Sequence, residues 1–145
     1  MSMKSDKARE LFSLGYNCAQ SVSAVFADDY GISQDEILKI SCGFGGGMRN
    51  GEVCGAVSGA IMVIGMKYGN GQNNSDEKKL ECYQKTVEFT NAFREKNKSI
   101  ICKELLGIDI FAGDGMQKAQ KANLFQTTCV DMIVDAVELL EQLGY

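Results

Sequence analysis

The sequence contains no histidine and no proline among its 145 residues. Without histidine, the chain cannot form a Ser-His or Cys-His catalytic pair, a C-x-x-C-H haem attachment or a His-ligated zinc site. Proline interrupts helices and stiffens loops, so its absence suits a mostly helical chain. These two absences exclude several classes of enzyme and metal site, and they favour an all-α fold.

The charge pattern excludes further partners. The net charge is -4 and the pI is about 4.9, and no basic stripe is interleaved with aromatic residues. We therefore expect no nucleic-acid partner. Residues 1–7 are polar, unlike a signal peptide, and the longest apolar stretch, 60–66, is far shorter than the roughly 20 residues of a membrane span. We expect a cytoplasmic protein without a membrane segment, in a compartment where thiols stay reduced.

Length and hydrophobic pattern predict one domain over residues 1–145, with no internal repeat or linker. Residues 43–51 are rich in glycine and predict an irregular loop, whereas the segment from Cys54 to about Lys67 is apolar or small on all sides. We expect an all-α fold, a single compact bundle of about seven helices, with this apolar helix at its centre. The predicted helix caps are Ser5, Asn17, Ser33, Ser75, Ser99 and Thr127 or Thr128.

The chain has six cysteines but no C-x-x-C motif, so any shared site must be assembled from several helices. Four of them are predicted to lie in first turns, where free N–H groups and the helix dipole stabilise a thiolate. These four are Cys18, Cys54, Cys102 and Cys129. Cys18, Cys102 and Cys129 also share a helix face with apolar residues, so a packing role is the alternative. Cys42 and Cys82 are interpreted as packing residues.

The glycine-rich loop lacks the known nucleotide-binding fingerprints. Glycine permits turns with positive φ, and that is one reading of the loop. The other is that successive N–H groups form a nest for an anion, which makes the backbone of Gly45, Gly46 and Gly47 a candidate cofactor-binding element. Arg49 would be the one fixed positive charge beside such a nest.

Three segments carry a resemblance to a known family: 15–20 (GYNCAQ), 43–48 (GFGGGM) and 54–59 (CGAVSG). They resemble the C_GCAxxG_C_C family of redox-active proteins, and the likeness covers essentially the whole chain. The resemblance places the four family cysteines on Cys18, Cys54, Cys102 and Cys129, and it adds Gly55 to the candidate cofactor-binding backbone. It implies a redox role. A related module in split-Soret cytochromes resembles an iron–sulfur carrier, but this chain has no haem motif.

Three hypotheses follow. In the first, the four cysteines converge and either exchange between dithiol and disulfide or hold an iron–sulfur cluster or another thiolate-bound metal. Such a protein would work with an electron-transfer or thiol-redox partner protein. In the second, the chain is a non-catalytic module that binds a small anion or a partner through the glycine-rich loop, and its cysteines are structural. In the third, it is a helical interaction protein without a site.

Overall fold

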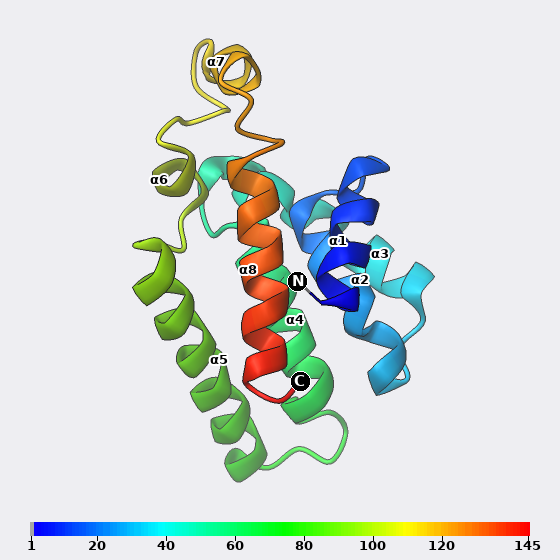
Figure 1. Ribbon diagram of the computed structural model, residues 1–145. Coiled ribbons are helices and arrows are strands. Elements are labelled where there is room, and N and C mark those ends of the chain that lie inside the picture. Colours follow the sequence, from blue (N-terminus) through cyan, green and yellow to red (C-terminus); the bar gives the residue numbers. More distant parts are fainter. Residues whose placement is uncertain (1) are drawn as a thin grey trace.

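The computed structural model describes residues 2–145, which form eight α-helices and no β-strand (Figure 1). The helices are α1 (Met3–Ser13), α2 (Cys18–Ala27), α3 (Gln34–Ser41), α4 (Gly55–Tyr68), α5 (Asp76–Asn97), α6 (Cys102–Leu106), α7 (Gly115–Lys121) and α8 (Thr128–Gln142). Short turns occupy Asp28–Tyr30 (η1), Cys42–Phe44 (η2) and Gly47–Gly51 (η3). The predicted all-α fold is confirmed, with one helix more than expected. Within residues 2–145, no helix combines the length and the hydrophobicity that a membrane crossing requires.

Most helix starts follow from local side-chain chemistry. The predicted N-caps Asn17, Ser33 and Ser75 are confirmed, and each side chain accepts a backbone N–H of its helix. Thr127 occupies the predicted N-cap position of α8, but its side chain makes no cap bond. Two predicted caps are wrong. Ser2 caps α1 and forms a reciprocal capping box with Ser5, because a serine at either position can accept an N–H bond. Ser99 accepts the N–H of Ile101, and Ile101 itself is the N-cap residue of α6, without a side-chain cap.

Helix α4 lies at the centre of the bundle, as predicted. Its residues 55–60 are all buried, as are Val63 and Ile64. It packs against α2, α5 and α8, and Figure 1 shows it behind α8, with α1–α3 on one side and α5 on the other. The largest side chains around it are Phe26, Phe89 and Phe93, all fully buried. A separate small cluster lies beneath α6 and α7, which close one end of the bundle.

Two glycines bring the backbone of α4 against that of α2. A Cβ atom on Gly59 would lie 2.7 Å from the carbonyl oxygen of Ala19. A Cβ on Gly55 would lie 3.0 Å from both the Ala19 nitrogen and the Cys18 Cβ. Real Cβ atoms essentially never approach other atoms as closely as 2.7 Å, so the contact at position 59 requires glycine, and a Cβ at position 55 would force its neighbours to shift slightly. This contact fixes the position of Cys18, the first residue of α2, relative to the start of α4.

We predict that Gly59→Leu destabilises the fold by about 1–3 kcal/mol or more, because the side chain would collide with the α2 backbone. Gly59→Ala should also destabilise, but less. Gly65→Ala on the same helix is the matched control. A Cβ there meets nothing within 4 Å, so better helix propensity should stabilise it by about 0.5–1 kcal/mol. Urea unfolding of the three variants checks this, and equal stability of Gly59→Leu and the parent would contradict it.

Candidate functional site

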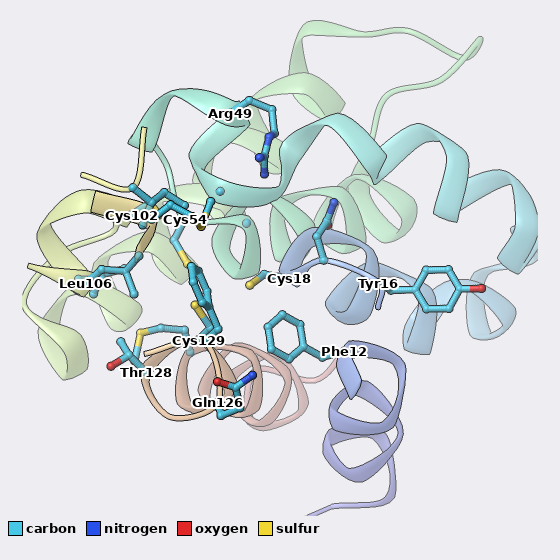
Figure 2. Close-up of a pocket in the computed structure, with 18 of the residues that line it drawn as sticks. Phe12, Tyr16, Cys18, Arg49, Cys54, Cys102, Leu106, Gln126, Thr128 and Cys129 are labelled. Carbon is cyan, nitrogen blue, oxygen red and sulfur yellow. The ribbon is translucent and has the colours of Figure 1, made fainter. Parts of the chain in front are cut away.

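All four predicted cysteines line one cavity of about 370 Å³ at the end of the bundle where α2, α4, α6 and α8 begin (Figure 2). Cys18 and Cys102 are the first residues of α2 and α6. Cys54 is the N-cap residue of α4, and Cys129 is the second residue of α8. The predicted placement at helix starts is therefore confirmed. Their chemical role stays a prediction.

A short backbone pairing holds Cys54 and Cys102 near each other. Val53 and Ile101 form an isolated antiparallel β-bridge, and each is followed directly by one of these cysteines. The Cys54 N–H donates to the carbonyl of Ile100 at 2.7 Å, and the Cys102 N–H donates to that of Glu52 at 2.6 Å. The starts of α4 and α6 are thus tied together by main-chain hydrogen bonds, which do not depend on side-chain identity.

Side-chain caps hold Cys18. The Asn17 side chain accepts the N–H of Gln20 at 3.0 Å, and the Gln20 side chain accepts the N–H of Asn17 at 2.9 Å. Asn17 also donates from Nδ2 to the carbonyl of Cys42 at 2.7 Å. This network joins the start of α2 to the turn that precedes the glycine-rich loop. Across the cavity, the Cys129 N–H donates to the carbonyl of Leu124 at 3.0 Å.

The thiols of Cys18 and Cys129 interact directly. The Cys18 thiol hydrogen-bonds the sulfur of Cys129, which lowers the pKa of Cys129 and raises that of Cys18. Burial and the neighbouring sulfurs of Cys54 and Cys102 raise the pKa of Cys18 further. Both side chains are only half-buried. The pair is therefore asymmetric, with the thiolate favoured on Cys129 and the proton on Cys18.

Cys54 and Cys102 have the opposite character. They are 6% and 7% exposed. Burial raises the pKa of Cys54 to about 12 and that of Cys102 to about 11. The N–H groups of Ala56 and Val57 favour the Cys54 thiolate, and Arg49 favours that of Cys102, but burial outweighs both. The pKa is lowered only at Cys129, and the cause there is the interaction with Cys18 rather than the helix start. That interaction raises the pKa of Cys18, whereas burial dominates at Cys54 and Cys102.

The two remaining cysteines do not line the cavity. Cys82 is half-buried against the main core, in agreement with the packing interpretation. That interpretation is wrong for Cys42, which is exposed. Ile37 and Ser41 carry the buried face of α3, and Cys42 follows one residue beyond that face. What Cys42 contributes is its carbonyl, which accepts from Asn17.

The glycine-rich loop forms a left-handed turn. Gly46, Gly47, Met48 and Arg49 have successive φ values of 65°, 66°, 58° and 62°. A Cβ on Gly47 would overlap the backbone of Glu52, so the loop supports the conformational reading of its glycines. Gly46, Arg49 and Gly55 line the cavity, whereas Gly45 and Gly47 do not. Cofactor binding by this backbone stays a prediction.

The sequence reasoning missed the apolar part of the cavity. Its wall includes Phe12, Leu105, Leu106, Ile110, Met116, Phe125 and Met132. These residues come from α1, α6, α7, α8 and the segments before α7 and α8. Each fits an ordinary core pattern in its own helix or segment, so no local signal sets it apart. Only the folded structure shows that they surround the cysteines.

The comparison with family models then adds an independent finding. The model described as "Putative redox-active protein (C_GCAxxG_C_C)" matches residues 16–143. This chain belongs to the C_GCAxxG_C_C family. Comparisons with curated proteins and with solved structures gave no match. As a C_GCAxxG_C_C protein it is a cysteine-containing member of a redox-active family, and the matched region includes all four cavity cysteines.

We predict that the free energy of unfolding falls at alkaline pH. Burial raises the pKa of Cys54 to about 12, against an ordinary 9.0. Below about pH 9 the thiol is protonated in both the folded and the unfolded protein, and the free energy of unfolding keeps its full value. Between pH 9 and pH 12 only the unfolded protein ionises, so the free energy of unfolding falls by up to about 1.4 kcal/mol per pH unit. Urea unfolding at pH 7 to pH 11 should show a shallower decline for Cys54→Ala than for the parent. Cys42→Ala, which alters an exposed thiol, should keep the parental slope. Parallel curves for Cys54→Ala and the parent would contradict the assignment.

Proposed function

We propose that this C_GCAxxG_C_C protein performs thiol–disulfide exchange, with Cys129 as the attacking thiolate and Cys18 as the resolving thiol. The observation that carries the proposal is the pairing of these two thiols in one cavity, where their interaction lowers the pKa of Cys129 and raises that of Cys18. A thiolate attacks a disulfide, whereas a thiol does not, so the sulfur with the lowered pKa is the one suited to begin the reaction. Both residues are only half-buried, as access by a substrate requires.

The exchange balances without further reactants. The Cys129 thiolate attacks one sulfur of a substrate disulfide, a mixed disulfide forms, and the other substrate sulfur leaves as a thiolate. Cys18 then loses its proton to solvent and attacks the Cys129 sulfur, which releases the second substrate thiolate. The substrate disulfide has gained two electrons and becomes two thiols. The protein has lost two electrons and holds a Cys18–Cys129 disulfide. A reducing thiol reverses the sequence.

Cys54 and Cys102 would have a supporting part in this reaction. Burial keeps both protonated at neutral pH, so neither is suited to attack a substrate. A charge on Cys54 would repel a charge on Cys18, since Cys54 raises the pKa of Cys18. Because both buried thiols stay uncharged, they add no repulsion when Cys18 loses its proton in the second step. The partner in the exchange would be a small disulfide or a thiol-redox protein.

A second candidate is an iron–sulfur cluster, favoured by the gathering of four thiols around one cavity. A single metal ion does not fit, because no three potential ligands of the described chain are placed to hold one. Four cysteines are nevertheless the donor set of common clusters, which supply one-electron transfer. Cys18, Cys54, Cys102 and Cys129 would hold the cluster, and each thiol would have to be deprotonated. Anaerobic reconstitution with iron and sulfide tests this candidate, since absorption and acid-labile sulfide report the cluster directly.

We predict that Cys129 is alkylated by iodoacetamide at pH 7 faster than any other cysteine of the folded protein. Cys18→Ala removes the donor of the hydrogen bond, so the pKa of Cys129 should rise and its alkylation at pH 7 should slow. Peptide mass spectrometry after short exposure measures each site separately. Cys82→Ala is the control and should leave the rate at Cys129 unchanged. Faster alkylation of Cys129 in the Cys18→Ala variant would contradict the proposed pair.

We further predict that a Cys42→Ala/Cys82→Ala double variant, treated with a small disulfide under native conditions, forms a Cys18–Cys129 disulfide. Both substitutions lie outside the cavity, so the exchanging pair should be intact. Non-reducing peptide mapping identifies the linkage, and a Cys18→Ala version of this variant should stop at the mixed disulfide on Cys129. Six unreactive thiols in the parent protein would favour the binding module with structural cysteines over the exchange reaction.

A further inference from the structure

The cavity that holds the cysteines contains a single charged side chain. Apart from the four thiols, its wall is mainly apolar and aromatic, with a few neutral polar groups, and Arg49 is the only charged residue that residues 2–145 contribute to it. Its volume of about 370 Å³ is within the range of small-molecule sites. Figure 2 shows the Arg49 side chain above the cysteines, with its guanidinium directed toward the space between them. An apolar cavity with one cation at its edge fits a small organic molecule that has one anionic group.

The chain adopts unfavourable conformations to hold Arg49 at this place. Met48 and Arg49 have φ values of 58° and 62°, in the left-handed region that residues with a side chain rarely adopt. The guanidinium lies over the ring of Phe111, 4.8 Å from its centroid, and Nη1 donates to the carbonyl of Gly45 at 3.4 Å. A Cβ on Gly46 would lie 2.9 Å from Nη1 and 3.0 Å from the Phe111 ring. Gly46 thus provides the space in which the cation and the ring meet.

Phe111 has no evident role in the core. It is 40% exposed, although large aromatic side chains are normally buried. It lies in the irregular segment between α6 and α7, where its N–H donates to the Asp109 carboxylate at 3.0 Å. Its ring supports Arg49 through a cation–π contact. The left-handed backbone of Met48 and Arg49 and the exposed ring of Phe111 therefore act together to orient the Arg49 guanidinium.

The guanidinium keeps its donors available. No ion pair in the described part of the chain includes Arg49. Its protein acceptor is the Gly45 carbonyl at 3.4 Å, at the long limit of a hydrogen bond. A planar guanidinium presents five N–H donors in a geometry that matches a carboxylate with two parallel hydrogen bonds. In a chain with a net charge of -4, a cation without a carboxylate partner beside reactive thiols is suited to bind an anionic ligand.

We propose that Arg49 is the specificity-determining residue of this cavity and that its substrates are small disulfides and thiols that carry a carboxylate. This rests on the exchange reaction proposed above. The carboxylate would bind the guanidinium, the apolar part of the substrate would contact the cavity wall, and the disulfide would be presented to Cys129. Phe111 is a positioning residue, because it touches Arg49 rather than the proposed substrate.

The experiment compares three small disulfides that differ in charge: 3,3′-dithiodipropionate, bis(2-hydroxyethyl) disulfide and cystamine. The rate of Cys129 oxidation by each is divided by its rate with the same protein unfolded in concentrated urea, which removes intrinsic reactivity. For the folded parent we expect a normalised rate with the dicarboxylate about tenfold above that with the neutral disulfide. The cationic disulfide should react more slowly than the neutral one.

Variants test the assignment to Arg49. Arg49→Gln should abolish the preference for the dicarboxylate, so that the ratio of its normalised rate to that of the neutral disulfide falls from about ten to about one. Arg49→Lys keeps the charge but loses the paired hydrogen bonds and the stacking, so it should retain part of the preference. Phe111→Leu should lower the same ratio to a value between those of the parent and Arg49→Gln, because the guanidinium loses the ring that orients it. Lys103→Gln removes the same charge from a nearby lysine that pairs with Glu52 outside the cavity wall, and it should behave like the parent.

A non-reacting ligand provides a second measurement. Hexanoate should slow the alkylation of Cys129 in the parent protein and in Lys103→Gln, but not in Arg49→Gln, and hexanamide should have no effect. Equal normalised rates with all three disulfides, or a preference that survives Arg49→Gln, would overturn the role of Arg49 and leave the exchange reaction standing. Failure of every disulfide to oxidise Cys129, together with protection by hexanoate, would overturn the exchange reaction and leave the anion site standing.

Discussion

The contact between the backbones of α2 and α4 is the constraint on which the cysteine site depends. At Gly55 and Gly59 the two helices approach so closely that a Cβ would meet the backbone or side-chain root of Ala19 and Cys18. Because α4 is central, this contact sets one wall of the cavity, and the remaining helices pack around the pair. Two glycines in one helix reduce its intrinsic stability. This loss of helix stability occurs where the close contact fixes the distance between the start of α2 and the start of α4.

The electrostatics of the cavity reflect a competition between helix starts and burial. Every cysteine of the cavity lies where free N–H groups favour a thiolate. Removal from water acts against the thiolate and prevails at Cys54 and Cys102. At Cys129 the hydrogen bond from Cys18 outweighs burial. One thiolate among several protonated neighbours is an arrangement with low mutual repulsion, since four charged sulfurs in one apolar cavity would oppose each other strongly.

Local chemistry explains which features were visible in the sequence. Asn17 and Ser75 open helices through their own side chains, so the residues themselves predict those boundaries. The apolar character of α4 likewise predicts its central place. The bridge between Val53 and Ile101 has no such signal, because it joins residues that lie far apart in the chain. The left-handed conformation of Met48 and Arg49 was also invisible, since neither residue type prefers it and neighbouring contacts impose it. Burial depth, which decides the pKa of Cys54, depends on the assembled fold in the same way.

The pairing of Cys18 with Cys129 joins the second helix of the bundle to the last. Contacts between such distant residues form only after most of the intervening chain has closed, because loop closure costs entropy before a contact can compensate for it. During synthesis, Cys18 and Cys54 leave the ribosome long before Cys129 exists. The lowered pKa of Cys129 depends on Cys18 and therefore arises only in the completed bundle. A nascent or misfolded chain would carry ordinary thiols at these positions, so the reactivity that we propose for Cys129 would belong to the native state alone.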